Sequence, residues 1–324
     1  MGLKSVAVVG GGIAGVACAK QLLSAGLNVV VFEKARGVGG RMSTRRTDWA
    51  QYDHGAQYFT VRDPGFRRLI DGMLSNGTVA VWQPVMEKPD SEPWYVATPG
   101  MTAIARFLAN GLDIRTSQRV VAILRQGEQW RLTFEDETQS DCFDAIVVAV
   151  PNEQAVPLIE PVQPTWAGWL RAVPTLPCWT LMVSTPKLDV HVQAGFGEQG
   201  PIGWFAQNDS KPGRAVLAGQ QDWVVQATSE WTIEHLQTDK AEVTERMLAA
   251  FGDMLGLKQM PVLHTPMVHR WLYARRTPGI SPVAPSLWSA STGLGVCGDG
   301  LTHSRIEQAY LSGHHLASSM LVGA

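Results

Sequence analysis

The spacing of three glycines near the N-terminus constrains the fold more than any other feature of the sequence. The apolar run Val6–Val9 predicts a strand buried on both faces. The motif Gly10-x-Gly12-x-x-Gly15 joins this strand to a predicted helix over Ile13–Ala25, and a second apolar strand is expected over Asn28–Phe32. Two strands and a helix within about 30 residues predict an α/β domain built on a parallel sheet.

The same glycines predict a phosphate-binding turn. Gly10 permits the tight turn, Gly12 lets the backbone approach a pyrophosphate, and Gly15 lets the helix pack close to the strand. Unpaired N–H groups at the helix start attract an anion. Glu33 ends the second strand, where a carboxylate can accept hydrogen bonds from ribose hydroxyls. The motif favours a dinucleotide over an empty glycine-rich turn, but it does not separate NAD from FAD.

Composition removes several function classes. The 324 residues carry a formal net charge of −2 and no basic run, which argues against a nucleic-acid partner. The four cysteines lie far apart, without a CxxC pair or a neighbouring histidine, so neither a metal site nor a disulfide is expected. No segment predicts a membrane span, and Met1–Ser5 leave no room for a signal peptide, so we expect a cytoplasmic location.

The rest of the chain predicts two interleaved regions. Helices are expected over Pro64–Leu74 with Asp63 as N-cap and over Met101–Ala109, and strands over Val120–Leu124, Trp130–Phe134, Phe143–Val150 and Gly293–Cys297. Alternating segments such as Trp179–Val183 and Ala215–Ala218 predict an antiparallel sheet, with an amphipathic helix over Asp239–Leu255. We therefore expect one discontinuous domain over 1–75, 99–160 and 275–324, and a second over 76–98 and 161–274.

The last helix is expected over Ser304–Leu321, immediately after the turn Gly298-Asp299-Gly300. Ser304 stands three residues before Glu307, which is the spacing of a capping box. This turn, together with the glycine-rich segments Arg36–Met42 and Asp53–Phe59, suggests further close approach of backbone to one large ligand and favours a flavin. A simple NAD-dependent dehydrogenase would leave the C-terminal turn and helix unexplained.

With these segments in view, the sequence resembles the FAD-dependent amine-oxidoreductase superfamily, and within it the renalases of bacterial type. The resemblance depends on VAVVGGGIAGVACAKQL, EKARGVGGRMST, DHGAQYFT, YVATPGM, FDAIVVAVP and VCGDGLTHSRIEQA, which are spread along the whole chain. It implies a Rossmann-like FAD-binding domain with a parallel sheet and an interleaved α+β substrate domain with a mainly antiparallel sheet, as in p-hydroxybenzoate hydroxylase and the amine oxidases.

The resemblance also implies roles for individual residues toward a non-covalently bound FAD. Glu33 would bind the adenosine ribose, the Ala14 backbone and Arg41 would lie by the pyrophosphate, and the Ile306 N–H would face the flavin pyrimidine ring. Cys297 falls where the family places ribityl contacts, so no covalent link to it is expected. The residues implied in cofactor binding are Gly10, Gly12, Ala14, Gly15, Glu33, Lys34, Gly40, Arg41, Ala56, Gln57, Val120, Asp299 and Ile306.

For the reaction, the resemblance implies oxidation of the 2- and 6-dihydro isomers of NAD(P)H to NAD(P)+, with O2 reoxidising the flavin to give hydrogen peroxide. Such a donor becomes aromatic on losing a hydride, so no general base is required, and the sequence shows no carboxylate pair or Ser/His/Asp set. His303 is the one catalytic candidate, while His54 is expected at a loop surface. The residues expected at the substrate are Gln57, Tyr58, Phe59, Tyr95, Val96, Thr98 and His303.

Two other functions stay open at this point. One is an amine oxidase or desaturase on the same fold, which is disfavoured because the segment His269–Trp271 carries no lysine. The other is a flavin-binding protein without turnover. The substrate wall could draw on any of six tryptophans, at positions 94, 179, 204, 223, 271 and 288. The preferred isomer, the choice of NAD or NADP, and the oligomeric state do not follow from the sequence.

Overall fold

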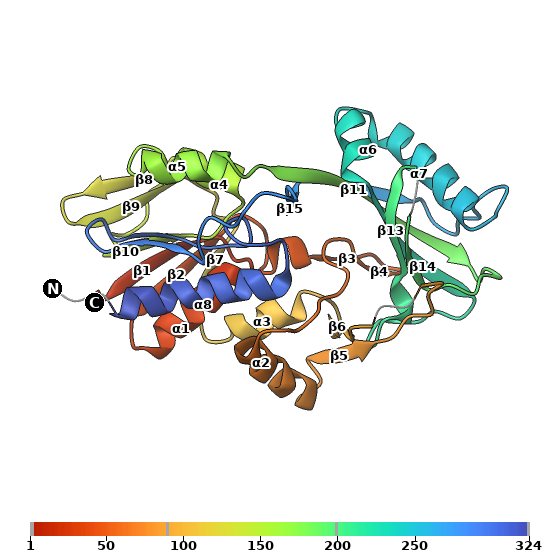
Figure 1. The fold of residues 1–324 in the computed structure, drawn as a ribbon, viewed down its shortest axis with the longest axis horizontal. Helices are drawn as coiled ribbons and strands as arrows, with labels where there is room; N and C mark the ends of the chain where they lie inside the picture. Colours follow the sequence, from red (N-terminus) through yellow and green to blue (C-terminus); the bar gives the residue numbers. More distant parts are fainter. Residues whose placement is uncertain (1–2, 89–90, 198–199, 323–324) are drawn as a thin grey trace.

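The computed structural model describes residues 3–88, 91–197 and 200–322 and contains two main sheets (Figure 1). The first sheet has the strand order β16-β17-β10-β1-β2-β7. All its pairs are parallel except β16 with β17. Its strands are β1 (Ser5–Val9), β2 (Asn28–Glu33), β7 (Asp113–Thr116), β10 (Ala145–Val148), β16 (Leu287–Ser289) and β17 (Leu294–Val296).

Helices and a hairpin cover both faces of this sheet, because the strands are apolar on both sides. Val6 and Val8 belong to the core shared with α1 (Ile13–Ser24), α2 (Pro64–Ser75), α3 (Ala103–Ala109) and α8 (Ile306–Val322). Ala7 and Val9 belong to the core on the other face. That face is covered by α4 (Asn152–Ile159), α5 (Pro164–Arg171) and the hairpin of β8 (Val120–Gln126) and β9 (Gln129–Phe134).

The second sheet is antiparallel, with the order β12-β13-β14-β11-β15. Its core packs against the helix α7 (Lys240–Met254), in which Val243, Met247 and Phe251 are buried. The remaining bounds are α6 (Ser229–Glu234), β11 (Thr175–Pro186), β12 (Ala194–Phe196), β13 (Ile202–Gln207), β14 (Gln220–Ala227) and β15 (Met267–Arg276).

Short elements connect the two sheets. They are the 3-10 turns η1 (Gly40–Met42) and η2 (Asn208–Ser210), the paired strands β3 (Thr44–Arg46) and β4 (Gln51–Asp53), the helix α2 (Pro64–Ser75), and the paired strands β5 (Val79–Trp82) and β6 (Trp94–Ala97). Asp63 caps α2 as expected, since its side chain accepts from the N–H groups of Gly65 and Phe66. None of the described helices is both long and apolar enough to cross a bilayer.

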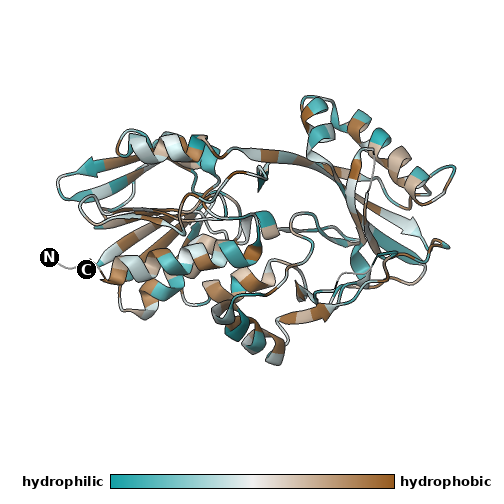
Figure 2. Cartoon of the chain, in the orientation of Figure 1, coloured by the Kyte–Doolittle hydropathy of each residue, from teal (hydrophilic) through white to brown (hydrophobic). Residues whose placement is uncertain are grey.

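The predicted fold class is confirmed: a Rossmann-like parallel sheet is combined with an antiparallel sheet in one chain. Apolar residues concentrate on the strands of the first sheet, while the outer helices carry both kinds of residue (Figure 2). The exact domain boundaries stay predictions. Residues 1–2, 89–90, 198–199 and 323–324 of the expected domains lie outside the described residues.

Two expectations about local structure were wrong. The segment Ala215–Ala218 is not a strand; Val216 and Leu217 are exposed, and β14 begins only at Gln220. The capping box of the last helix does not form either, because both side chains bond elsewhere. Ser304 Oγ accepts from the Arg276 N–H at 2.6 Å, while the Glu307 carboxylate accepts from the N–H groups of Arg62 and Asp63. The helix α8 consequently begins at Ile306.

A close backbone contact positions α8 on the first turn of α1. A Cβ added to Gly313 in α8 would lie 2.0 Å from the carbonyl oxygen of Ala14, so only glycine allows this approach. Gly72 in α2 is the opposite case, since it is exposed and a Cβ there would meet no atom within 4 Å.

Gly313→Ala should therefore destabilise the protein by about 1–3 kcal/mol, because α8 must move away from α1 to relieve the overlap. The matched control Gly72→Ala should be neutral or stabilising by about 0.5–1 kcal/mol, since alanine is the better helix former. Urea unfolding of both variants measures the difference. Equal stability of the two would contradict the contact between α8 and α1.

Candidate active site

One large cavity of about 1360 Å³ opens between the two sheets. Its walls come from the carboxyl ends of β1, β2 and β17, from the loops that follow β10 and β17, and from β11, β13, β14 and β15 of the second sheet. Ligands of α/β sheets bind at the carboxyl ends of the strands. A single small-molecule site occupies about 300–1,000 Å³, so this cavity has room for a cofactor together with a second ligand.

The turn before α1, which the sequence predicts to bind phosphate, lies at the cavity. Gly10, Gly12 and Ala14 line the cavity, and a Cβ at Gly12 would meet no protein atom within 4 Å. The backbone is therefore open to a ligand at that position. Gly15 does not line the cavity; a Cβ there would lie 2.0 Å from the Gly10 carbonyl oxygen, so its role is to let helix and strand approach. These residues fit a pyrophosphate.

Glu33 lies at the same end of the cavity, at the carboxyl end of β2. Its Oε2 accepts from the Gly11 N–H at 2.7 Å and its Oε1 from the Ala35 N–H at 2.7 Å, which fixes the direction of the carboxylate. Lys34, whose Nζ donates to Gln154 Oε1 at 3.0 Å, and Val120 at the start of β8 also line this end. The carboxylate therefore has a fixed direction at this end of the cavity, and its contact with a ribose stays a prediction.

Arg41 and Asp299 join two distant parts of the chain at the cavity wall. The guanidinium donates to both carboxylate oxygens, at 3.0 and 2.5 Å, and also to the Ala274 carbonyl. The charge of Arg41 is thus paired with Asp299, and the N–H groups at the start of α1 offer a further positive element at this end of the cavity. Gly40 and Ile306, the first residue of α8, line the cavity as well.

The loop that follows β4 forms the part of the wall nearest the second sheet. Ala56 and Gln57 line the cavity as expected. Both polar atoms of the Gln57 amide are hydrogen-bonded within the protein. Nε2 donates to the carbonyls of Asp53 and Gly55, and Oε1 accepts from Lys211 Nζ at 3.1 Å. Gln226 Nε2 also donates to the Gly55 carbonyl, at 2.8 Å, which ties the loop to β14.

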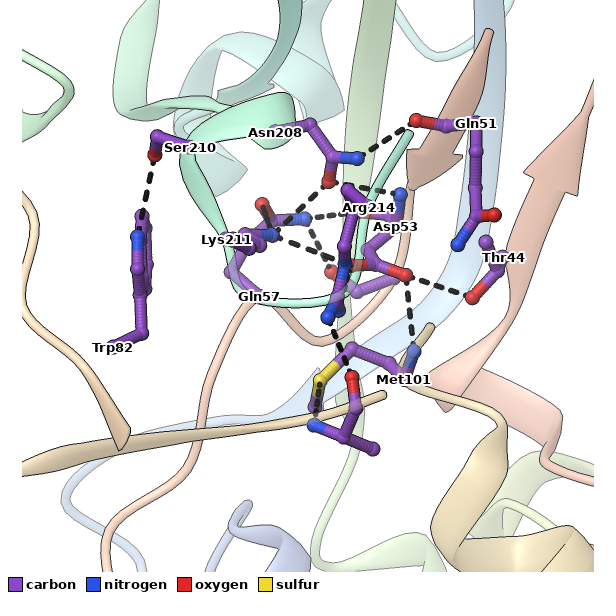
Figure 3. Close-up of polar contacts among 12 residues, drawn as sticks. Thr44, Gln51, Asp53, Gln57, Trp82, Met101, Asn208, Ser210, Lys211 and Arg214 are labelled. Atoms are coloured by element: carbon purple, nitrogen blue, oxygen red, sulfur yellow. Dashed lines mark hydrogen bonds and ion pairs between the residues drawn. The ribbon is translucent and has the colours of Figure 1, made fainter. Parts of the chain in front are cut away.

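A buried network of charges lies behind this loop (Figure 3). Arg214 donates to Asp53 Oδ2 at 3.1 and 2.5 Å, and Lys211 Nζ lies 3.5 Å from the same oxygen. Burial alone would raise the pKa of Asp53, but the charges of Lys211 and Arg214 outweigh it and hold the pKa below its usual value. Burial lowers the pKa of Lys211 to about 8 despite the nearby carboxylate.

Aromatic rings line the part of the cavity formed by the second sheet. Tyr58 stacks on Trp94 with ring centroids 3.9 Å apart and lies 5.4 Å from Trp204. Phe196 packs edge-on against Trp204 at 4.7 Å. Tyr58, Phe196, Trp204, Trp271 and Tyr273 all line the cavity. Among the six tryptophans considered from the sequence, Trp204 and Trp271 are therefore the two on this wall.

Two histidines lie beside Trp271. His54 was expected at a loop surface, but it is only 6% exposed and packs edge-on against His269 at 4.9 Å. Its carbonyl accepts from Trp271 Nε1 at 2.8 Å, which explains the burial. Burial, with a smaller effect of neighbouring positive charge, lowers the pKa of each ring to about 4, so both are neutral at pH 7. Only His269 lines the cavity.

Several expected substrate residues lie away from the cavity. Gln57, Tyr58 and Phe59 line it, but Tyr95, Val96, Thr98 and His303 do not. Tyr95 and Val96 are buried in the core beneath α2, where the Tyr95 hydroxyl accepts from Arg67 at 2.7 Å, and Thr98 donates to the Gly77 carbonyl. His303 is exposed in the loop before α8. The structure thus gives no support for His303 as a catalytic group.

Sequence reasoning did not find Lys211, Arg214, His269 or Phe196. The two cations lie more than 150 residues from their partners Asp53 and Gln57, so no local spacing connects them. The only local signal is a lysine and an arginine within the polar segment Asn208–Arg214, which resembles an exposed turn. Among the residues that the structure describes, no cluster of His, Cys, Asp or Glu could hold a metal ion.

The chain matches two known families. The family model of NAD(P)-binding Rossmann-like domains matches residues 8–72, and the model of flavin containing amine oxidoreductases matches residues 79–321. Protoporphyrinogen oxidase 2 of Arabidopsis thaliana is 41% identical over 70 residues, which are 22% of this chain and 14% of that protein. Flavin-containing amine oxidase B of Homo sapiens is 54% identical over 54 residues, 16% of this chain and 10% of that protein. Both similarities thus cover only a small part of these longer relatives.

Solved structures share the fold over the full length. A protein from Exiguobacterium sp. 255-15 that carries the provisional name protoporphyrinogen oxidase has a TM-score of 0.79 at 13% identity, with all of both chains covered. A triple mutant of putrescine oxidase has a TM-score of 0.73 at 14% identity, with 99% of both chains covered. Identities this low show the fold alone. The family match covers well over half of the chain, so the chain belongs to the flavin-containing amine oxidoreductases, and its cofactor is FAD.

Proposed function

We propose that this protein is a flavin oxidase that removes a hydride from the 2- or 6-dihydro isomers of NAD(P)H. The overall change converts the dihydronicotinamide, O2 and a proton into NAD(P)+ and hydrogen peroxide. The partners are then a small dinucleotide and O2. This specificity is finer than the family similarity, which covers amine oxidases, protoporphyrinogen oxidases and a desaturase.

The bound FAD would supply the hydride acceptor. The start of α1, Glu33, Lys34 and Val120 would hold its adenosine and phosphates, and the loop of Ala56 and Gln57 would lie beside its isoalloxazine ring. Ile306 begins α8 at the cavity, where the positive end of the helix dipole favours negative charge on the ring. We propose non-covalent binding: burial raises the pKa of the Cys178 thiol at the cavity wall to about 11, which keeps that thiol protonated.

The aromatic wall of the second sheet is the observation that carries the proposal. Tyr58, Phe196, Trp204 and Trp271 give the cavity flat surfaces that suit a planar dihydropyridine ring. A stacked ring can bring only some of its carbons to the reacting distance of roughly 3–3.5 Å. Rigid stacking would therefore separate one dihydro isomer from another.

The chemistry of the wall agrees with a donor that needs no base. Among the described lining residues, the one lysine is Lys34, which lies beside Glu33 at the adenosine end. A dihydropyridine becomes an aromatic pyridinium when its hydride leaves, and no proton has to be removed. Amine oxidation is the second candidate, supported by the family similarity and by the neutral ring of His269 at the aromatic end.

Anaerobic mixing with candidate donors tests the proposal. The 2- and 6-dihydro isomers of NAD should bleach the flavin absorbance quickly, and ordinary 4-dihydro NADH at least 100-fold more slowly, because a 1 Å misplacement costs about 10²-fold in rate. Stopped-flow absorbance near the flavin maximum measures both. Faster bleaching by putrescine or benzylamine would assign the protein to amine oxidation instead. A flavin bleached by none of these donors would indicate a binding protein without this turnover.

Glu33→Ala should weaken FAD retention at least tenfold. The variant loses a charged hydrogen-bond acceptor for the ribose, and such bonds are worth about 1.5–3 kcal/mol. It also releases the N–H groups of Gly11 and Ala35. Flavin released by acid and read by absorbance, per mole of protein, measures the loss. Glu242→Ala on the exposed face of α7 is the control and should retain its flavin. Full flavin retention in Glu33→Ala would show that Glu33 does not bind the ribose.

Phe196→Ala should raise the dihydronicotinamide KM about 2- to 10-fold, since an aromatic contact is worth about 0.5–1.5 kcal/mol. Phe196 is 59% exposed, so its removal should leave folding and flavin content unchanged. Trp169→Ala on α5 is the matched control: that ring is 44% exposed and does not line the cavity. Steady-state peroxide production measures both variants. An unchanged KM in Phe196→Ala would remove this ring from the substrate site.

A further inference from the structure

The network behind the cavity wall carries more positive than negative charge. Its charged members are Lys211, Arg214 and Asp53, whose side chains are 0%, 1% and 0% exposed. Asp209, on the neighbouring turn η2, forms no ion pair with either cation among the described contacts; its oxygens accept from the Asp222 N–H and Gln207 Nε2 instead. Two buried cations therefore face one carboxylate, in a place where water cannot screen them.

The polar partners of Lys211 are fixed. Its ammonium group donates to Gln57 Oε1 at 3.1 Å and to Asn208 Oδ1 at 3.2 Å, and it lies 5.3 Å above the ring of Trp82 (Figure 3). Asn208 in turn donates to the Gln51 carbonyl at 2.7 Å and accepts from the Asp53 N–H at 3.2 Å. The cation consequently has one defined position rather than a range of rotamers.

Gln57 connects this cation to the cavity. The side chain of Gln57 lines the cavity, and every polar atom of its amide is bonded to the chain behind it. Lys211 does not reach the cavity itself. The ammonium group is thus separated from the cavity by a single side-chain amide whose dipole is held with its oxygen toward the cation.

We propose that Lys211 is a positioning residue that holds Gln57 and raises the reduction potential of the flavin through the uncompensated positive charge it shares with Arg214. The proposal rests on the proposed function, in which the isoalloxazine ring lies beside Gln57. Reduction adds negative charge to that ring, and a fixed cation in a dry environment stabilises added negative charge without having to reorganise. The same charge favours an anion bound at the ring.

Two variants should shift the reduction potential of the flavin in opposite directions. Lys211→Met removes a cation and keeps the shape of the side chain, so the potential should fall. Asp53→Asn removes the anion, so the potential should rise. Both variants break bonds of one network, and a merely structural role would shift both in the same direction or shift neither. Lys211→Arg, which restores the cation, should return the potential toward that of the unaltered protein.

Sulfite binding by the oxidised holoenzyme gives a readout that needs no substrate. Sulfite is an anion that adds to flavins, so its dissociation constant reports the local charge. We expect the constant to rise at least tenfold in Lys211→Met and to fall in Asp53→Asn. Dye-equilibration potentiometry should show the matching change, about 30 mV for a tenfold effect on a two-electron couple. Lys258→Met, which removes an exposed lysine after α7, should change neither quantity.

Unchanged sulfite binding and potential in Lys211→Met, or shifts of one sign in both variants, would overturn the proposal. If Lys211→Met does not accumulate as folded holoenzyme, Lys211→Gln replaces it, because glutamine removes the charge and keeps a donor for Gln57. Failure of the proposed dihydronicotinamide activity would show in the unaltered protein as absent bleaching. That outcome is independent of the sulfite and potential measurements.

Discussion

The close packing of backbone on backbone around the first turn of α1 is the constraint on which the rest of the structure depends. Gly15 lets this helix approach the end of β1, and Gly313 lets α8 approach Ala14 on the same turn. A side chain at either position would push apart the elements that form the first-sheet end of the cavity. Successive residues of β1 point to opposite faces, and both faces are buried: α1, α3 and α8 pack on one, and α4 and α5 on the other.

The second sheet gives the cavity a different chemical character. The first sheet contributes backbone N–H groups and the Glu33 carboxylate, which suit phosphates and ribose. The second contributes aromatic rings and neutral His269, which suit an uncharged ring. The loop of Ala56 and Gln57 lies between these surfaces. The Ala56 N–H donates to the Arg41 carbonyl, and Gln226 on β14 donates to the Gly55 carbonyl. One cavity can therefore hold two ligands in a defined relation.

The features predictable from sequence are those that depend on neighbours in the chain. Continuous apolar runs identify β1, β2 and β10, and the glycine spacing identifies the turn before α1. The predictions that failed depend on distant partners. Ser304 and Glu307 have the spacing of a capping box, but the backbone N–H groups of Arg276 and Arg62 compete for their oxygens. Likewise, nothing near Lys211 in the sequence shows that it is buried against Asp53 and Gln57.

The position of α8 has a consequence for the order in which the chain can acquire its structure during synthesis. Residues 306–322 follow all the other described elements, yet they cover the face of the first sheet that includes Val6 and Val8. At a translation rate of about 5–20 residues per second, this apolar face waits on the order of tens of seconds for its last helix. The nascent strands β1 and β2 therefore remain partly uncovered until residues 306–322 have left the ribosome, and transiently exposed apolar surface of this kind is what chaperones bind.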